Sequence, residues 1–191
     1  LSHHSVCQQP FEGTIETTNM TIDEYGTPQQ FTMVMHIKQD MIAIRNSKIG
    51  NTPASTIIYR DDSHVVWMLD EENNSYFEIR QDDSVRQIQS SEADISTVSH
   101  TGRKRKVAGH MCDQIIIKGN EQETELWATK SLGHLYDTIT KALGGESYGK
   151  GWEGRIMQLG YYPLIAATRV GGKVLESQEV TKIEKKPLAR E

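Results

Sequence analysis

The stretch at 102–112, GRKRKVAGHMC, brings basic, imidazole and thiol side chains close together. Four consecutive basic residues, Arg103 to Lys106, are able to hold an anion, and the His110 and Cys112 side chains are soft metal ligands. On a strand, residues two apart share a face, so His110 and Cys112 would point the same way, while the basic side chains would alternate between faces. This alternation favours a solvated edge strand over a single anion site for the basic run. No second tight ligand pair accompanies His110 and Cys112, so we predict no metal site there.

Motifs of the common enzyme classes are missing from the chain. It contains no Walker-type loop, no H-E-x-x-H, no G-x-S-x-G and no Cys-x-x-Cys. Adjacent carboxylates point to opposite faces of a strand, which indicates surface and turn positions rather than acid/base pairs for Asp61-Asp62, Glu71-Glu72 and Asp82-Asp83. We therefore predict no catalytic residue, no cofactor and no enzyme activity.

Composition limits the class of protein further. The 191 residues suit one domain, and a net charge of −5 argues against a nucleic-acid partner bound through a general positive field. No run of about 18 apolar residues exists, so no transmembrane segment is expected. The first residues lack the basic and apolar regions of a signal peptide. Two cysteines permit either one Cys7–Cys112 disulfide or two separate thiols.

Most of the chain alternates apolar and polar residues with a period near two, between turn residues. In QFTMVMHIK, for example, Phe31, Met33, Met35 and Ile37 fall on one face. The pattern predicts about eleven strands, which suits an extended antiparallel sheet, a sandwich or a barrel. The expected strands lie within residues 11–20, 30–38, 41–46, 55–62, 64–74, 75–81, 103–109, 111–120, 123–130, 163–172 and 173–185. Gly171-Gly172 is expected to join the last two.

Helical spacing is confined to two segments. Leu135 and Ile139 begin an apolar stripe that predicts a helix over residues 133–143, and WEGRIMQ at 152–158 predicts a second short one. The polar tract around residues 81–99 fits either a long connection or a weak strand.

Several quoted segments resemble one bacterial envelope family, known as domain of unknown function 4412. The likeness lies in KVAGHMCDQIIIK and ETELWATKSLG, in the closing YYPLIAATRVGGKVLESQEVTKIEK, and in the opening FEGTIETT and MHIKQDMIAIRN. The resemblance implies an exported, periplasmic protein with a fold similar to the carriers LolA and LppX. That fold is a strongly curved antiparallel sheet forming an unclosed half-barrel, with one or two helices over the concave face. We expect a tail at residues 1–10 and a single LolA-like β domain at 11–187.

The carriers named by this resemblance hold acyl chains in the concavity. Methionines supply a soft, adaptable apolar surface of the kind that lines such a cavity, although an ordinary core shows the same pattern. The expected lining residues are Met33, Met35, Ile42, Ile44, Trp67, Met68, Trp127, Leu135 and Ile139.

These observations favour a non-enzymatic exported envelope protein that binds a lipid, a lipoprotein acyl chain or another hydrophobic molecule. The alternative is a structural or protein-interaction module with a filled core and no ligand. The ligand's identity and the oligomeric state are not determined by the sequence.

Overall fold

The chain forms one antiparallel sheet in a computed structural model that describes residues 11–60, 62–80, 95–119, 121–133, 135, 139 and 152–188. The strands are β1 (Gly13–Ile22), β2 (Pro28–Lys38), β3 (Met41–Asn46), β4 (Ser55–Arg60), β5 (Val65–Asp70), β6 (Ser75–Arg80), β7 (Ile95–Val107), β8 (His110–Gly119), β9 (Gln122–Thr129), β10 (Tyr162–Val170) and β11 (Lys173–Lys185). The short helices η1 (Lys130–Leu132) and α2 (Trp152–Gln158) follow β9.

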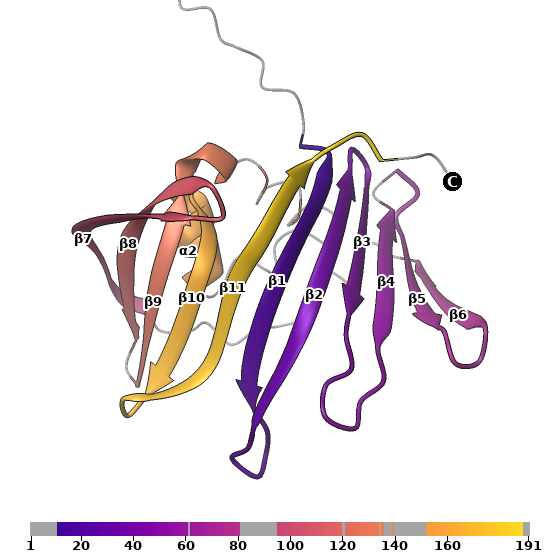
Figure 1. Ribbon diagram of the computed structural model, residues 1–191, viewed down its shortest axis with the longest axis horizontal. Helices are drawn as coiled ribbons and strands as arrows, with labels where there is room; N and C mark the ends of the chain where they lie inside the picture. The colour runs from indigo at the N-terminus through magenta and orange to yellow at the C-terminus, as the bar shows by residue number, and fades with distance from the viewer. Residues whose placement is uncertain are drawn as a thin grey trace, which may run out of the picture.

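The sheet is curved and does not close into a barrel (Figure 1). Its order is β6-β5-β4-β3-β2-β1-β11-β10-β9-β8-β7, so in the described part of the chain β6 and β7 are the edges. The first and last strands meet at the centre, and each half is a meander of hairpins. Gly171 and Gly172, with φ of 57° and 80°, form the tight turn that joins β10 to β11, as the Gly-Gly pair predicts.

The predicted strand number and unclosed sheet are confirmed, and α2 spans the residues of WEGRIMQ. In the polar tract, β7 begins at Ile95, while residues 81–94 lie outside the described part. Of the helix expected over 133–143, the structure describes Gly133, Leu135 and Ile139, all of them helical.

One face of the sheet, called the inner face here, carries the apolar residues of the alternating pattern. Directly opposed residues share a face, and a continuous rung of such pairs runs from the centre of the sheet toward β6. Its members are Ile15, Met35, Ile44, Ile57, Met68 and Phe77.

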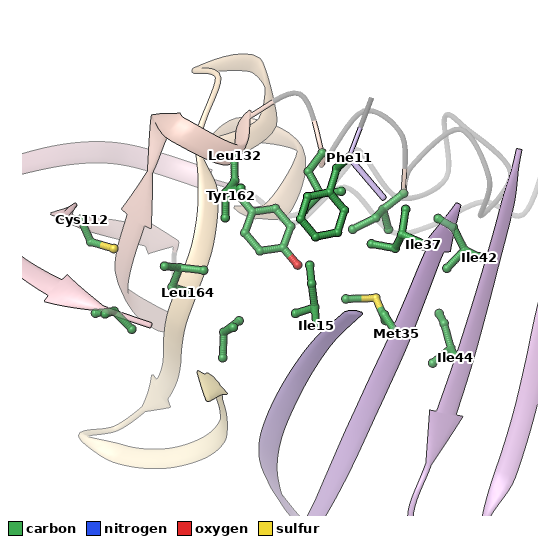
Figure 2. Packing of buried hydrophobic residues seen from close by; sticks show 14 residues of the cluster. Phe11, Ile15, Met35, Ile37, Ile42, Ile44, Cys112, Leu132, Tyr162 and Leu164 are labelled. Atoms are coloured by element: carbon green, nitrogen blue, oxygen red, sulfur yellow. The ribbon is translucent and has the colours of Figure 1, made fainter. Parts of the chain in front are cut away.

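Two clusters of buried residues lie against this sheet. The larger one joins Ile15 and Met35 to Tyr162 and Leu164, which face them across the cluster in Figure 2. Leu135 belongs to the same cluster and has no exposed surface. In the second cluster, Trp152 and Ile156 of α2 pack on strand residues from β8, β9 and β10, which are Ile115, Ile117, Leu126, Ala128 and Ala166. Helical residues therefore cover the inner face in two places.

Candidate functional site

Two adjacent cavities open on the inner face. The first has a volume of about 290 Å³ and the second a volume of about 350 Å³. These volumes are near the lower end of the range of roughly 300–1,000 Å³ for small-molecule sites. Both cavities are lined by Asn19, Phe31, Trp152, Glu153 and Gln178, so they are neighbours across a shared wall.

The first cavity has mainly apolar walls that come from both halves of the sheet. Met33 and Met35 of β2 line it beside Ile44 of β3, which is the direct partner of Met35. Tyr162 of β10 and Val180 of β11 line the same space. Because these strands belong to different hairpins, the cavity exists only once β1 and β11 pair at the centre.

Four of the nine expected lining residues line this cavity: Met33, Met35, Ile44 and Ile139. Ile42 and Leu135 belong to the adjoining buried cluster, where neither has exposed surface. Met68 lies on the inner face but farther out, on β5, and its side chain is 40% exposed.

Neither of the two tryptophans among the expected lining residues, Trp67 and Trp127, lines the cavity. Trp67 pairs with Ile58, so it alternates with the inner-face residue Met68, and its indole N–H donates to Glu78 Oε2 at 3.1 Å. Trp127 alternates with Leu126, which packs beneath α2. Its half-buried ring packs against the larger cluster, and the Arg105 guanidinium lies over it at 4.3 Å. The run HVVWMLD is apolar at every central position, so its period could not assign a face to Trp67.

The sequence analysis missed several lining residues. Phe31 was on the predicted face of β2 but was not included, whereas Tyr162 and Val180 come from the distant C-terminal strands. In the β1–β11 register Thr17 opposes Val180, and Thr17 also opposes Met33 of β2, so Val180 falls in the same row as Met33. Tyr162 reaches the cavity from β10. The sequence reveals the apolar pattern of each strand but not the register in which distant strands pair.

Ionisable groups at the site are affected by burial. Desolvation in the cavity wall raises the pKa of Glu153, and the nearby carboxylate of Glu176 raises it further. Burial also raises the pKa of Tyr162, so its phenol is neutral at physiological pH. The site thus contains a neutral phenol and a carboxylate that is costly to ionise.

The basic run belongs to β7, an edge of the described sheet, as expected for a solvated strand. Lys104 Nζ pairs with Asp113 Oδ1 at 3.2 Å, while Arg105 lies over Trp127. The charges of Lys104 and Arg105 are therefore directed to different partners.

His110 and Cys112 bond to neighbouring groups. His110 Nδ1 is 2.8 Å from Ser131 Oγ, and the Cys112 thiol donates to the His110 carbonyl oxygen at 3.6 Å. Cys112 is a buried free thiol, and desolvation raises its pKa to about 11. Cys7 lies outside the described residues, so the Cys7–Cys112 bridge stays a prediction. No group of three or more His, Cys, Asp or Glu side chains able to hold a metal occurs among the described residues.

The described carboxylates of the acidic pairs, Asp62, Glu71 and Glu72, occupy exposed surface positions as expected. Asp62 Oδ2 lies 2.6 Å from Arg60, and Glu71 Oε2 lies 3.1 Å from Arg45. Asp61, Asp82 and Asp83 lie outside the described residues.

The family model of DUF4412, described as a domain of unknown function, matches residues 11–191. The chain belongs to this family. A search of curated proteins finds no match to this DUF4412 chain. In the part of it that the structure describes, no helix is long and apolar enough to cross a membrane.

Solved structures similar to this DUF4412 protein include an uncharacterized conserved protein from Thermus thermophilus. The two share 12% sequence identity with a TM-score of 0.50, over 93% of this chain and 82% of that one. PNGF-II is similar at 15% identity and a TM-score of 0.43, over 93% of this chain and 28% of that one. A LolA superfamily protein from Nitrosomonas europaea is similar at 9% identity and a TM-score of 0.39, over 94% of this chain and 88% of that one.

Proposed function

We propose that this DUF4412 protein is a non-enzymatic, exported envelope protein that holds a lipid or lipoprotein acyl chain against the inner face of its sheet. The first cavity is the binding site, and Ile139 together with Trp152 and Glu153 of α2 forms its cover. The observation that carries the proposal is the mainly apolar wall of the first cavity, to which the half-buried Met33 and the buried Met35 and Val180 contribute.

Burial of an acyl chain in this cavity provides affinity without a catalytic group. Each methylene transferred from water contributes about 0.8 kcal/mol, so a few methylenes give useful binding. Met33, Met35 and the ring of Phe31 supply adaptable apolar contact area. Ile139 contacts the chain from the helical side of the cavity.

Native mass spectrometry of the purified full chain tests this proposal. We expect adducts with the mass of amphiphiles, and we expect a delipidated sample to bind a monoacylglycerol again. Recovery of no amphiphile from the protein, together with no rebinding, contradicts the proposal.

Two neighbouring substitutions on β2 provide a matched test of the site. Met33→Gln places an amide in the cavity wall, and we expect it to weaken binding about tenfold or more. Val34→Gln adds the same amide at a half-buried position on the opposite face and should leave affinity unchanged. Equal losses in both variants would show that the chain does not bind in the cavity.

A second candidate function rests on the edge strand β6. Tyr76 and Phe77 are 63% and 65% exposed there, and Ile79 is 44% exposed. An edge strand with exposed apolar side chains is suited to pairing with an extended partner segment. Loss of a protein partner on Phe77→Glu, with lipid binding intact, would support this second function.

A further inference from the structure

The inner face changes from apolar to polar along three adjacent strands, β1, β11 and β10. On β11, Val180 is followed toward the strand's start by Gln178 and then Glu176. The directly opposed residues of β1 are Thr17, Asn19 and Thr21. On β1 the change comes one position earlier, between Ile15 and Thr17, so the polar region spans neighbouring strands and is not confined to β11.

β10 continues the same gradient on the other side of β11. Ala166 opposes Gln178, and Thr168 opposes Glu176. The Thr168 hydroxyl lies 3.1 Å from that of Thr124 on β9, which makes the outermost level polar across four strands. The two cavities lie in the same order as this change from apolar to polar residues. Val180 lines the first cavity, and Glu176 and Thr168 line the second.

The polar end of this path carries negative charge and no described positive charge. Glu153 lines both cavities and Glu176 lines the second, beside the amides of Asn19 and Gln178. Among the described residues that line either cavity there is no Lys, Arg or His. An anionic head group placed here would face two carboxylates without a counter-charge.

The same groups suit a ligand that donates hydrogen bonds. Carboxylate and amide oxygens accept from N–H and O–H groups, and Glu153 gains a partner that offsets the cost of its burial. The amphiphile would therefore lie along the gradient, with its chain beside Met35 and Val180 and its head beside Glu153 and Glu176.

We propose, resting on the function proposed above, that the ligand is a single-chain amphiphile whose head group bears hydrogen-bond donors and no negative charge. Amines and hydroxylated neutral heads share this chemistry. Fatty acids and phosphate-bearing lipids bind more weakly because Glu153 and Glu176 repel their negative charge.

Competition among three amphiphiles with hexadecyl-length chains tests the head-group preference. Hexadecylamine, 1-monopalmitoylglycerol and palmitate are titrated into the delipidated full chain at about pH 7.5, below their aggregation concentrations. We expect the amine and the glycerol ester to bind about tenfold or more tightly than palmitate. Palmitate binding as tightly as both others overturns this inference but leaves the proposed function standing, whereas no binding of any of them overturns the proposed function.

Charge-removing variants assign the preference to the site. Glu153→Gln and Glu176→Gln should each improve palmitate binding severalfold relative to the glycerol ester. The matched control is Glu179→Gln, which removes a charge from an exposed position of β11 that alternates with Gln178 and Val180. We expect no change in that variant. An equal gain in the control would assign the effect to net charge and overturn the inference.

Discussion

Two regions of the sheet bear similar apolar inner faces but differ in what lies on them. In the covered half, made of β8, β9 and β10, Ile115 and Leu126 pack beneath Ile156 of α2 and have no exposed surface. In the open arm, made of β4, β5 and β6, Met68 is 40% exposed and Phe77 is 65% exposed. Both regions continue the same alternating pattern across paired strands.

The difference shows that alternation assigns a residue to a face but does not determine whether that face becomes core, cavity or surface. The covering element decides this. Where α2 packs closely the face is core, and where Ile139 and Trp152 approach without filling the space a cavity remains. In the open arm, the described residues place no helix over Phe77.

The largest expected contrast concerns thiol reactivity. In a Cys7→Ser background, Cys112 should react with a thiol reagent at about pH 8 at least about a hundredfold more slowly than a cysteine introduced by Ser75→Cys in the open arm. Cys112 has no exposed surface and its pKa is raised from 9.0 to about 11, so little thiolate forms, whereas Ser75 is exposed. Reaction followed with and without denaturant measures the contrast. Similar native-state rates at the two positions would contradict the burial of Cys112.

Truncating an apolar side chain in each of the two regions should change the free energy of unfolding by different amounts. Ile156→Ala removes a fully buried side chain of α2, and we expect it to lower the free energy of unfolding by about 2–5 kcal/mol. Phe77→Ala removes an exposed ring from the open arm and should change it by less than about 0.5 kcal/mol. Urea unfolding measures both values. A comparable loss in Phe77→Ala would mean that another element covers the open arm in solution.

The smallest expected effect is on the Tm and concerns Glu153, an α2 residue that lines the cavities. Burial raises the pKa of the Glu153 carboxyl in the folded state. Its ionisation therefore lowers the free energy of unfolding above that pKa. This loss of stability is absent below the unfolded-state pKa near 4.5, where the carboxyl is protonated in both states. Glu153→Gln should therefore raise the Tm slightly at about pH 7 and leave it unchanged near pH 4. Glu179→Gln, at an exposed position, serves as the control and should leave the Tm unchanged at both pH values. A Tm gain in Glu153→Gln that is equal at both pH values would contradict the burial of this charge.

Much of the fold could be predicted because its determinants are local. Alternation located the strands, and the turn residues Gly171 and Gly172 located the final hairpin. The seven residues of α2 were also recognised from their pattern. Strand β7 began earlier than predicted, at Ile95, because a polar strand at the sheet edge lacks an apolar face that marks its start.

The candidate site was less predictable because it depends on register between distant strands. The pairing of Thr17 with Val180 joins residues far apart in the chain, and no local pattern predicts it. The apolar run around Trp67 left its face undetermined. The polar end formed by Asn19, Gln178 and Glu153 was missed because each of these residues alone resembles an ordinary surface position.

Photo-crosslinking of a bound acyl chain tests the central claim most directly. The full chain is irradiated with a monoacylglycerol that carries a diazirine at the end of its acyl chain, and the adducts are mapped by peptide mass spectrometry. The account predicts adducts in β2 around Met35 and in β10 or β11 around Tyr162 and Val180, and their loss on competition with unlabelled monoacylglycerol. Adducts confined to the exposed apolar residues of β5 and β6, or no competable adduct at all, would contradict it.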